Sequence, residues 1–185
     1  VMGYESHTYS TTYGVGDNYP AYYVNWHQAA DFANHLTDYV NSQNGTGFSR
    51  CYSCSNSGHP TNVSCVESVS PYQCDGYSLP TEAEWELAAR SGTTSEFWTG
   101  NGSQFGGDYS SDSCSTSVTI QDGVTNPSLG DYAWFCANGN SLSQEVATKL
   151  PNDFGLYDMH GNVWEWSADW EGCGVDSEWC GTPSS

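Results

Sequence analysis

The sequence predicts an α+β domain with two helices, short strands, many loops and disulfide bonds. Helical periodicity follows a helix-start signal at two places, after Asn25 and after Thr81. Twenty glycines accompany few long periodic runs, which is typical of a loop-rich chain. Eight cysteines, an even number, indicate disulfides and an oxidising compartment: secreted, cell-surface or periplasmic.

Length and charge restrict the partners of the chain. A chain of 185 residues has the size of one domain, so we expect residues 1–185 to form a single domain. With 37% hydrophobic residues, it has enough apolar surface to fold. The net charge of −19 argues against nucleic acid and anionic membranes, and no apolar run indicates membrane insertion. A solvated acidic surface or cation binding both fit this charge.

The first helix is expected to follow a short strand over 21–24. Asn25 has the position of an N-cap, and Gln28 is its capping-box partner. The helix should end before Asn44-Gly45. Its apolar stripe is predicted to comprise Trp26, Ala29, Ala33, Leu36 and Val40. The polar residues off that stripe are His27, Asp31, Asn34, His35 and Asp38. Of these, His27 and His35 are expected to be surface residues, the alternative being that they are ligands.

Residues 48–75 form a cysteine-rich insertion. Cys51, Cys54, Cys65 and Cys74 have spacings that fit either a zinc site or two disulfides. We favour disulfides, because the acidic chain and its four further cysteines fit a secreted protein. The expected pairs are Cys51–Cys74 and Cys54–Cys65, which would restrain an insertion with little core of its own.

The second helix is expected over 82–90, after a short strand over 77–79. Thr81 and Glu84 form its capping box, and Arg90 should pair with a carboxylate near the helix end. Residues 93–150 read as irregular. Two further disulfides are candidates, Cys114–Cys136 and Cys173–Cys180.

Residues 151–170 hold the densest group of aromatic and charged side chains. A strand over 163–166 would place Trp164 and Trp166 on one face, where two indoles would be buried together. Glu165 would then lie in apolar surroundings and need a counter-charge, hydrogen-bond donors or a metal ion.

Three stretches resemble the formylglycine-generating enzyme, or sulfatase-modifying factor, family. They are GLYDMHGNVWEW (155–166), YPAYYVNWHQAADFANHL (Tyr19–Leu36) and GYSLPTEAEWELAAR (Gly76–Arg90). The three stretches occur in the family's order, and the match covers about 19–170 with a poorly matching middle. The resemblance implies a C-type-lectin-like fold and bound calcium.

The same resemblance implies a set of calcium ligands. A side-chain oxygen comes from Asp158, backbone carbonyls from Gly161 and Val163, and a carboxylate from Glu165. Such oxygen ligands suit calcium. In the alternative, Asp158 caps a turn and Glu165 pairs with Arg90 or a backbone donor. Asn162 is expected to be structural. The candidates for another calcium site, by residue type alone, are Asp131, Asn138 and Asn140.

Two functions remain open from the sequence. The family's catalytic cysteine pair, which binds copper, lies beyond an Arg-Gly-Gly-Ser strand, and neither feature matches here. We therefore expect a secreted, calcium-stabilised domain for binding a protein or glycan, or for homo- or hetero-assembly, and no catalytic residues. The alternative is a fragment of a copper oxidase that converts a substrate cysteine to formylglycine. A third hypothesis is a subunit whose missing strands are donated by a neighbour.

Overall fold

The computed structural model describes residues 13–59, 62–94, 98, 129–136 and 138–169. These residues group into two compact units. The first unit contains residues 24–85 and 165–169, and the second contains 13–23 and 86–164, less the gaps above. Each unit is described by itself, so the single domain stays a prediction.

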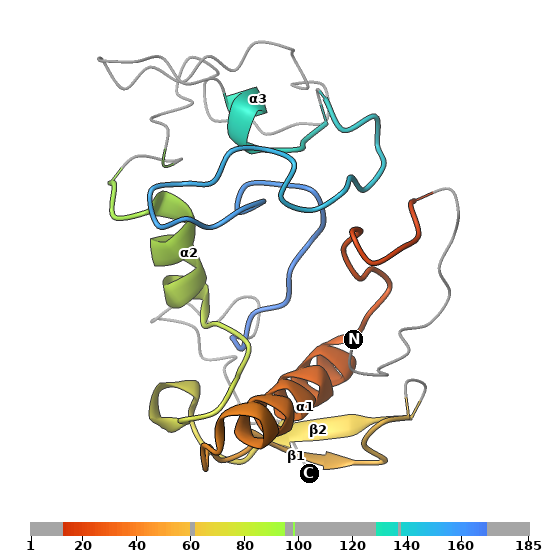
Figure 1. Cartoon of the computed structure of the whole chain (residues 1–185), viewed down its shortest axis with the longest axis vertical. Coiled ribbons are helices and arrows are strands. Elements are labelled where there is room, and N and C mark those ends of the chain that lie inside the picture. The colour runs from red at the N-terminus through yellow and green to blue at the C-terminus, as the bar shows by residue number, and fades with distance from the viewer. Residues whose placement is uncertain (1–12, 60–61, 95–97, 99–128, 137, 170–185) are drawn as a thin grey trace, which may run out of the picture. The chain divides into compact units, whose positions relative to one another are not determined.

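The described residues contain three α-helices and one two-stranded sheet (Figure 1). This content confirms the predicted α+β class with short strands and many loops. The elements in order are α1 (Trp26–Asn44), β1 (Tyr52–Ser55), β2 (Ser64–Glu67), a 3-10 turn η1 (Pro71–Gln73), α2 (Glu82–Arg90) and α3 (Leu129–Tyr132).

Helix α1 begins at the predicted capping box. The Asn25 side chain accepts a hydrogen bond from the Gln28 backbone N–H at 2.9 Å, and the Gln28 side chain accepts one from the Asn25 N–H at 2.7 Å. The helix ends at Asn44, one residue later than predicted, where Gly45 takes a left-handed conformation with φ 64°. A glycine adopts this conformation without the steric cost that a Cβ brings.

The buried face of α1 differs from the predicted stripe. Asp31 and Asn34, which lie off the predicted stripe, are 0% and 1% exposed, whereas Leu36 and Val40 of the stripe are only half-buried. The stripe did not predict this burial, because the cysteine-rich insertion supplies hydrogen-bond partners for these polar groups. Asn34, for example, donates to the Tyr52 carbonyl at 2.9 Å and accepts from the Tyr52 N–H at 3.2 Å.

The insertion folds into an antiparallel hairpin held by two disulfides. Strand β1 pairs with β2 so that Cys54 lies opposite Cys65. The bonds join Cys51 to Cys74 and Cys54 to Cys65, which confirms the predicted pairing. Because all four sulfurs are in disulfides, the alternative of a zinc–thiolate site is wrong.

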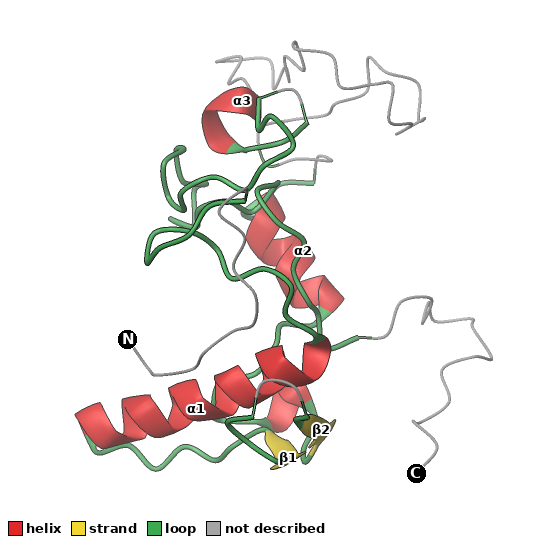
Figure 2. Cartoon of the chain, turned by 90° about the vertical axis from the view of Figure 1, so that its right-hand side faces the viewer, coloured by secondary structure: helices red, strands yellow, loops and turns green. Residues whose placement is uncertain are grey.

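The insertion and α1 share a hydrophobic core. Figure 2 shows the hairpin lying against α1. The insertion supplies most of the buried residues of this cluster and α1 supplies the others, so the core is shared and is not the insertion's own. Its members are Ala30, Ala33, Cys51, Tyr52, Val63 and Cys65.

Helix α2 has the predicted bounds, Glu82–Arg90. In its capping box, the Thr81 hydroxyl oxygen accepts from the Glu84 N–H at 3.2 Å and a Glu84 carboxylate oxygen accepts from the Thr81 N–H at 2.9 Å. At the other end, Arg90 forms an ion pair of 2.5 Å with Glu86, one turn earlier. The expected carboxylate partner of Arg90 is therefore present.

The three short strands predicted outside the insertion are absent at those residues. In 21–24, Tyr23 has a left-handed backbone with φ 58°, which interrupts an extended chain. In 77–79, side chains take the backbone donors: Tyr77 N–H donates to the Thr37 hydroxyl at 2.8 Å, and Leu79 N–H to the Tyr52 hydroxyl at 2.9 Å. No sheet partner among the described residues pairs with 163–166.

Helix α3 was not predicted, since residues 93–150 read as irregular. It buries Leu129, and Ala133 follows in the same small cluster. Cys136 is disulfide-bonded, and its predicted partner Cys114 lies outside the described residues, as do Cys173 and Cys180. Among the described residues, none of the helices has the length and apolarity needed to cross a bilayer.

Candidate metal centre

The predicted calcium loop is shaped by two left-handed residues. Asp158 has φ 59° and Asn162 has φ 71°. The Asn162 N–H donates to the Trp134 carbonyl at 2.7 Å, and the Gly161 N–H donates to the Asp158 carbonyl at 3.3 Å. A Cβ on Gly161 would collide with the Trp134 carbonyl oxygen. The loop therefore requires a glycine at position 161 to lie this close to Trp134.

The Asn162 side chain fastens this loop to a neighbouring segment. Its oxygen accepts from the Gln144 N–H at 2.9 Å, and its amide nitrogen donates to the Gln144 carbonyl at 3.1 Å. Both the oxygen and the nitrogen of the Asn162 amide are thus hydrogen-bonded to the backbone of Gln144. The expected structural role of Asn162 is confirmed.

Asp158 has one satisfied oxygen and one unsatisfied oxygen. Oδ2 accepts a hydrogen bond of 2.8 Å from the Ala147 N–H. Oδ1 is buried and has no hydrogen-bond partner among the described residues. A buried carboxylate oxygen without a partner carries a desolvation cost that a bound cation would offset. The turn-capping alternative accounts for Oδ2 alone.

The basic side chains of the protein are all engaged elsewhere. The chain has three Lys and Arg residues, and all three lie in the described part. Arg50 pairs with Asp38, Arg90 pairs with Glu86, and the Lys149 ammonium donates to the Gly130 carbonyl at 2.6 Å. With the basic groups so placed, a divalent cation is the chemistry that fits the free oxygen of Asp158.

The second unit also contains the two predicted backbone ligands, the carbonyls of Gly161 and Val163. The Gly161 carbonyl accepts a bond of 3.1 Å from the Val163 N–H, and a carbonyl oxygen has a second lone pair for a metal. Val163 follows two residues later in the same loop. Asp158, Gly161 and Val163 are therefore local neighbours along one turn of chain.

Glu165, the fourth predicted ligand, belongs to the first unit. Its Oε2 accepts a hydrogen bond of 2.6 Å from the indole N–H of Trp85. The sequence predicted Arg90 or a backbone N–H as the alternative partner of Glu165. The partner in the structure is instead the indole N–H of Trp85. Because the four residues are divided between the units, the complete set stays a prediction.

The two tryptophans around Glu165 are not a buried pair. Trp164 is fully exposed and Trp166 is 48% exposed. The expectation of two buried indoles was wrong because it assumed a strand, whereas Trp166 instead directs its N–H to the Val24 carbonyl at 2.9 Å. The first unit holds this stretch further by a bond of 3.0 Å from the Trp26 indole N–H to the Ser167 carbonyl.

The candidates for another calcium site have other roles or remain exposed. The Asn138 side chain accepts from the Phe135 N–H at 2.8 Å and donates to the Ala133 carbonyl at 3.0 Å, so it fixes a turn after α3. Asp131 and Asn140 are exposed.

His160 lies in the middle of the predicted calcium loop. Burial lowers the pKa of its imidazole, and a hydrogen bond to the backbone of Ala89 acts in the opposite direction. The lowered pKa favours the neutral ring at physiological pH. This side chain therefore adds no positive charge to the loop.

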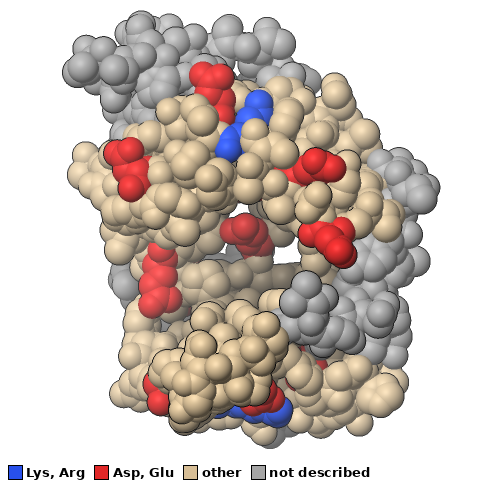
Figure 3. All heavy atoms as spheres, viewed as in Figure 1, with Lys and Arg blue, Asp and Glu red and all other residues tan. Residues whose placement is uncertain are grey.

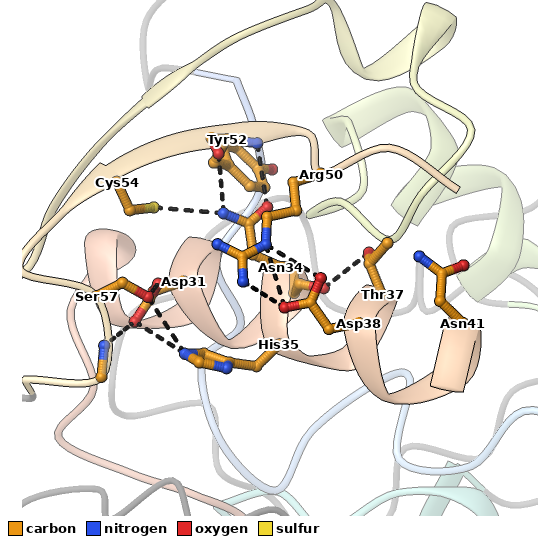
Figure 4. A network of polar contacts seen from close by, with 12 residues as sticks. Asp31, Asn34, His35, Thr37, Asp38, Asn41, Arg50, Tyr52, Cys54 and Ser57 are labelled. Atoms are coloured by element: carbon orange, nitrogen blue, oxygen red, sulfur yellow. Dashed lines mark hydrogen bonds and ion pairs between the residues drawn. The ribbon is translucent and has the colours of Figure 1, made fainter. Parts of the chain in front are cut away.

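A polar network on α1 was missed by the sequence reading (Figure 4). The buried Asp31 carboxylate accepts from the Ser57 hydroxyl at 2.6 Å and from the Gly58 N–H at 2.8 Å. The His35 Nε2 lies 3.7 Å from the same carboxylate. The sequence contained one signal for this contact. Ser57-Gly58 is a turn dipeptide between Cys54 and Cys65, so a turn that could pack against α1 was to be expected there.

Asp31 also lies close to sulfur atoms. One of its oxygens and the Sγ atoms of Cys54 and Cys65 are all within 4.8 Å of one another. These sulfurs form a disulfide and are not thiolates, which are the form that ligates metals. The group is therefore a packing arrangement, and the Asp158 loop is the better metal candidate.

Comparison with known proteins identifies the family of the chain. A family model, the sulfatase-modifying factor enzyme 1-like domain, matches residues 3–175. The chain belongs to this family.

Two curated relatives resemble the chain over part of their length. The formylglycine-generating enzyme of Mycobacterium tuberculosis is 38% identical over 112 residues, covering 60% of this chain and 33% of that protein. The chaperone protein LppX of Paenibacillus barcinonensis is 34% identical over 97 residues, covering 52% and 32% respectively. The chain thus matches about a third of the length of these relatives.

A solved structure covers more of the chain. The structure of Treponema denticola variable protein 1 has a TM-score of 0.55 and 30% sequence identity. The similarity covers 92% of this chain and 57% of that one. The predicted family fold is therefore confirmed.

Proposed function

We propose that this chain is a calcium-stabilised extracellular domain that binds a partner and does not carry out the family's thiol chemistry. The observation that carries the calcium part is the buried Oδ1 of Asp158, which has no hydrogen-bond partner among the described residues. Calcium, with oxygen ligands from Asp158, Gly161 and Val163 of the second unit, would satisfy this atom. The ion would stabilise the loop and need not touch a ligand.

The cysteines support binding over copper chemistry. Copper-dependent oxidation in this family would need thiolates. The cysteines in the described part of the chain are all in disulfides. Disulfides of this density fit an oxidising compartment, which supports a secreted, cell-surface or periplasmic location.

The acidic surface supports the exclusion of polyanions. On the face drawn in Figure 3, the described residues show more carboxylate side chains than basic ones. Together with the net charge of −19, this surface repels nucleic acid and anionic lipid. The partner is therefore proposed to be a protein or a glycan, or another copy or subunit in an assembly. Mass measurement by light scattering after size exclusion would detect such assembly.

The calcium proposal is tested by calorimetric titration of chelator-treated protein, followed by thermal unfolding. We expect heat of binding and a raised melting temperature, because a ligand that binds only the folded state stabilises it. Asp158→Ala should abolish both effects, and Asp158→Asn, which keeps one oxygen, should weaken them. Asp153→Asn is the matched control, since Asp153 is an exposed acid of the same stretch.

Two outcomes would refute the calcium site. One is the absence of both heat and thermal shift in the wild-type protein. The other is an equal loss of calcium affinity in Asp153→Asn and Asp158→Asn, which would point to diffuse binding by the acidic surface.

A second candidate function rests on the similarity to formylglycine-generating enzymes. In this alternative the chain is part of a copper oxidase that converts a substrate cysteine to formylglycine. Incubation with a Cys-x-Pro-x-Arg peptide, copper and a reductant separates the two. Mass-spectrometric detection of the aldehyde product would favour the oxidase, and an unchanged peptide would favour the binding domain.

A further inference from the structure

Three tyrosine rings of residues 13–23 form an aromatic cluster, which we define as Tyr13, Tyr22 and Tyr23. The ring centroids lie 5.9 Å apart for Tyr13 and Tyr22, 6.0 Å for Tyr13 and Tyr23, and 5.3 Å for Tyr22 and Tyr23. The interplanar angles are 70°, 84° and 76° in the same order. Each ring is steeply inclined to the other two, so the three faces point in different directions around one small region.

The backbone holds one of these rings in an unusual conformation. Tyr23 has φ 58°, and a bulky residue in this region is an outlier. Such strain persists where surrounding contacts impose it, and it is concentrated at functional sites. Here the strained residue is also solvent-accessible, because the Tyr23 side chain is 65% exposed. An exposed aromatic side chain with a strained backbone is not explained by core packing.

A hydrogen bond and contacts between the rings hold the aromatic cluster. The Tyr22 hydroxyl donates to the Gly14 carbonyl at 3.1 Å, which joins the two ends of the segment. Hydrogen bonding to Tyr13 raises the pKa of Tyr23, so the Tyr23 phenol stays neutral at physiological pH. Tyr13 is 36% exposed. The aromatic cluster is thus organised before any ligand arrives, and part of it is open to solvent.

The charge around the aromatic cluster selects the sign of a ligand. Residues 13–23 contain one acid, Asp17, and no Lys or Arg. The whole chain carries a net charge of −19. This charge raises the concentration of cations near the protein and lowers that of anions. The faces of aromatic rings carry the negative part of a quadrupole and attract cations.

We propose that the aromatic cluster of Tyr13, Tyr22 and Tyr23 binds a small molecule that carries a methylated ammonium group, of the choline type. A bulky, weakly hydrated cation of this kind can lie against several ring faces at once. Calcium, in contrast, requires oxygen ligands. This inference adds a ligand class to the proposed binding role and involves none of the predicted calcium ligands, so the two can fail separately.

The probe is choline, with 3,3-dimethyl-1-butanol as its uncharged isostere. Proton NMR of the choline methyl groups should show an upfield shift on addition of the whole protein, because protons above ring faces are shielded. The isostere should bind at least about fivefold more weakly, as expected from loss of the cation–π attraction. Both titrations are run with calcium present and with chelator, so that loss of calcium binding is distinguished from loss of choline binding.

Variants assign the binding to the aromatic cluster. Tyr23→Leu should raise the dissociation constant of choline by about fivefold or more, whereas Tyr23→Phe should keep most of the affinity, since the ring face remains. Tyr72→Leu is the control, because Tyr72 is the most exposed tyrosine of the described residues. Circular dichroism of each variant establishes that it is folded.

Four outcomes would overturn the proposal. They are no methyl shift with wild-type protein, equal binding of choline and its isostere, equal losses in Tyr23→Leu and Tyr72→Leu, and binding of a neutral sugar such as galactose in preference to choline. The last result would assign the aromatic cluster to carbohydrate.

Discussion

The hydroxyl of Ser57, in the cysteine-rich insertion, donates a hydrogen bond of 2.6 Å to the buried carboxylate of Asp31 in α1. This contact, with the Gly58 N–H on the other oxygen, anchors the turn of the hairpin to the helix. A buried charge is tolerated when donors surround it. The insertion therefore supplies the groups that make an acidic residue on the inner face of α1 stable.

Ser57→Ala is expected to lower the free energy of unfolding by about 1–2 kcal/mol, because it removes a donor from a buried charge. Urea denaturation followed by circular dichroism measures the change. The control is Ser53→Ala, an exposed serine of β1, which should change stability by less than about 0.5 kcal/mol. Equal effects in both variants would show that the bond to Asp31 contributes nothing.

Replacing both Cys51 and Cys74 by alanine should destabilise the protein by about 2–4 kcal/mol. The bond closes a loop between residues 23 positions apart, so its loss frees the unfolded chain. It also removes a sulfur from the core, since Cys51 is fully buried. The melting temperature should fall in this variant and fall further in wild-type protein treated with reductant, which also breaks the Cys54–Cys65 bond. A melting temperature insensitive to both changes would contradict the prediction.

The Asp38–Arg50 pair should give a pH-dependent contribution to stability. The hydrogen bond from Arg50 lowers the pKa of Asp38, so the folded state favours the charged carboxylate. This stabilisation is fully present above the ordinary pKa of an aspartate and is lost as the pH falls through the lowered pKa. Because both side chains are half-exposed, water screens the pair and limits it to about 1 kcal/mol.

Unfolding of Asp38→Asn and wild-type protein over a pH series measures this contribution. The difference between them should exist at neutral pH, disappear in acid and shrink at high salt. A difference that is constant with pH would mean that Asp38 acts by packing and not by charge. Asp153→Asn, at an exposed site, serves as the reference for general charge effects.

Gly161→Ala should destabilise the protein by about 1–3 kcal/mol, because the new methyl group would overlap the Trp134 carbonyl in a packed loop. Gly47→Ala is the control, since a Cβ there meets nothing within 4 Å. Thermal unfolding compares the two. If Gly161→Ala is as stable as Gly47→Ala, the close approach of Gly161 to Trp134 is not part of the native loop.

Local signals in the sequence predicted α1 and α2 well. The capping residues Asn25 and Thr81 placed both helix starts, because each capping box satisfies backbone donors that the helix itself leaves free. The pairing of Cys51 with Cys74 and of Cys54 with Cys65 was also predicted. Four cysteines allow three pairings, and their spacing alone does not decide among them.

The errors arose where a distant segment decides the environment. Asp31 and Asn34 lie off the predicted apolar stripe, yet both are buried because their donors come from the insertion, which no helical periodicity reveals. Residues 77–79 were read as a strand, but Thr37 and Tyr52 use their backbone donors. For the metal centre, the sequence motif supplied the ligand types, whereas the unpartnered oxygen of Asp158 could be found only in three dimensions.

The two disulfides of the insertion are nested, since Cys54–Cys65 lies inside the loop closed by Cys51–Cys74. A protease that cleaves between residues 56 and 64 would thus leave both new ends covalently attached to the rest of the molecule. The nicked protein would migrate as one band without reductant and as two with it. A backbone break in this span would therefore stay confined to a short segment whose two sides remain joined by both disulfides.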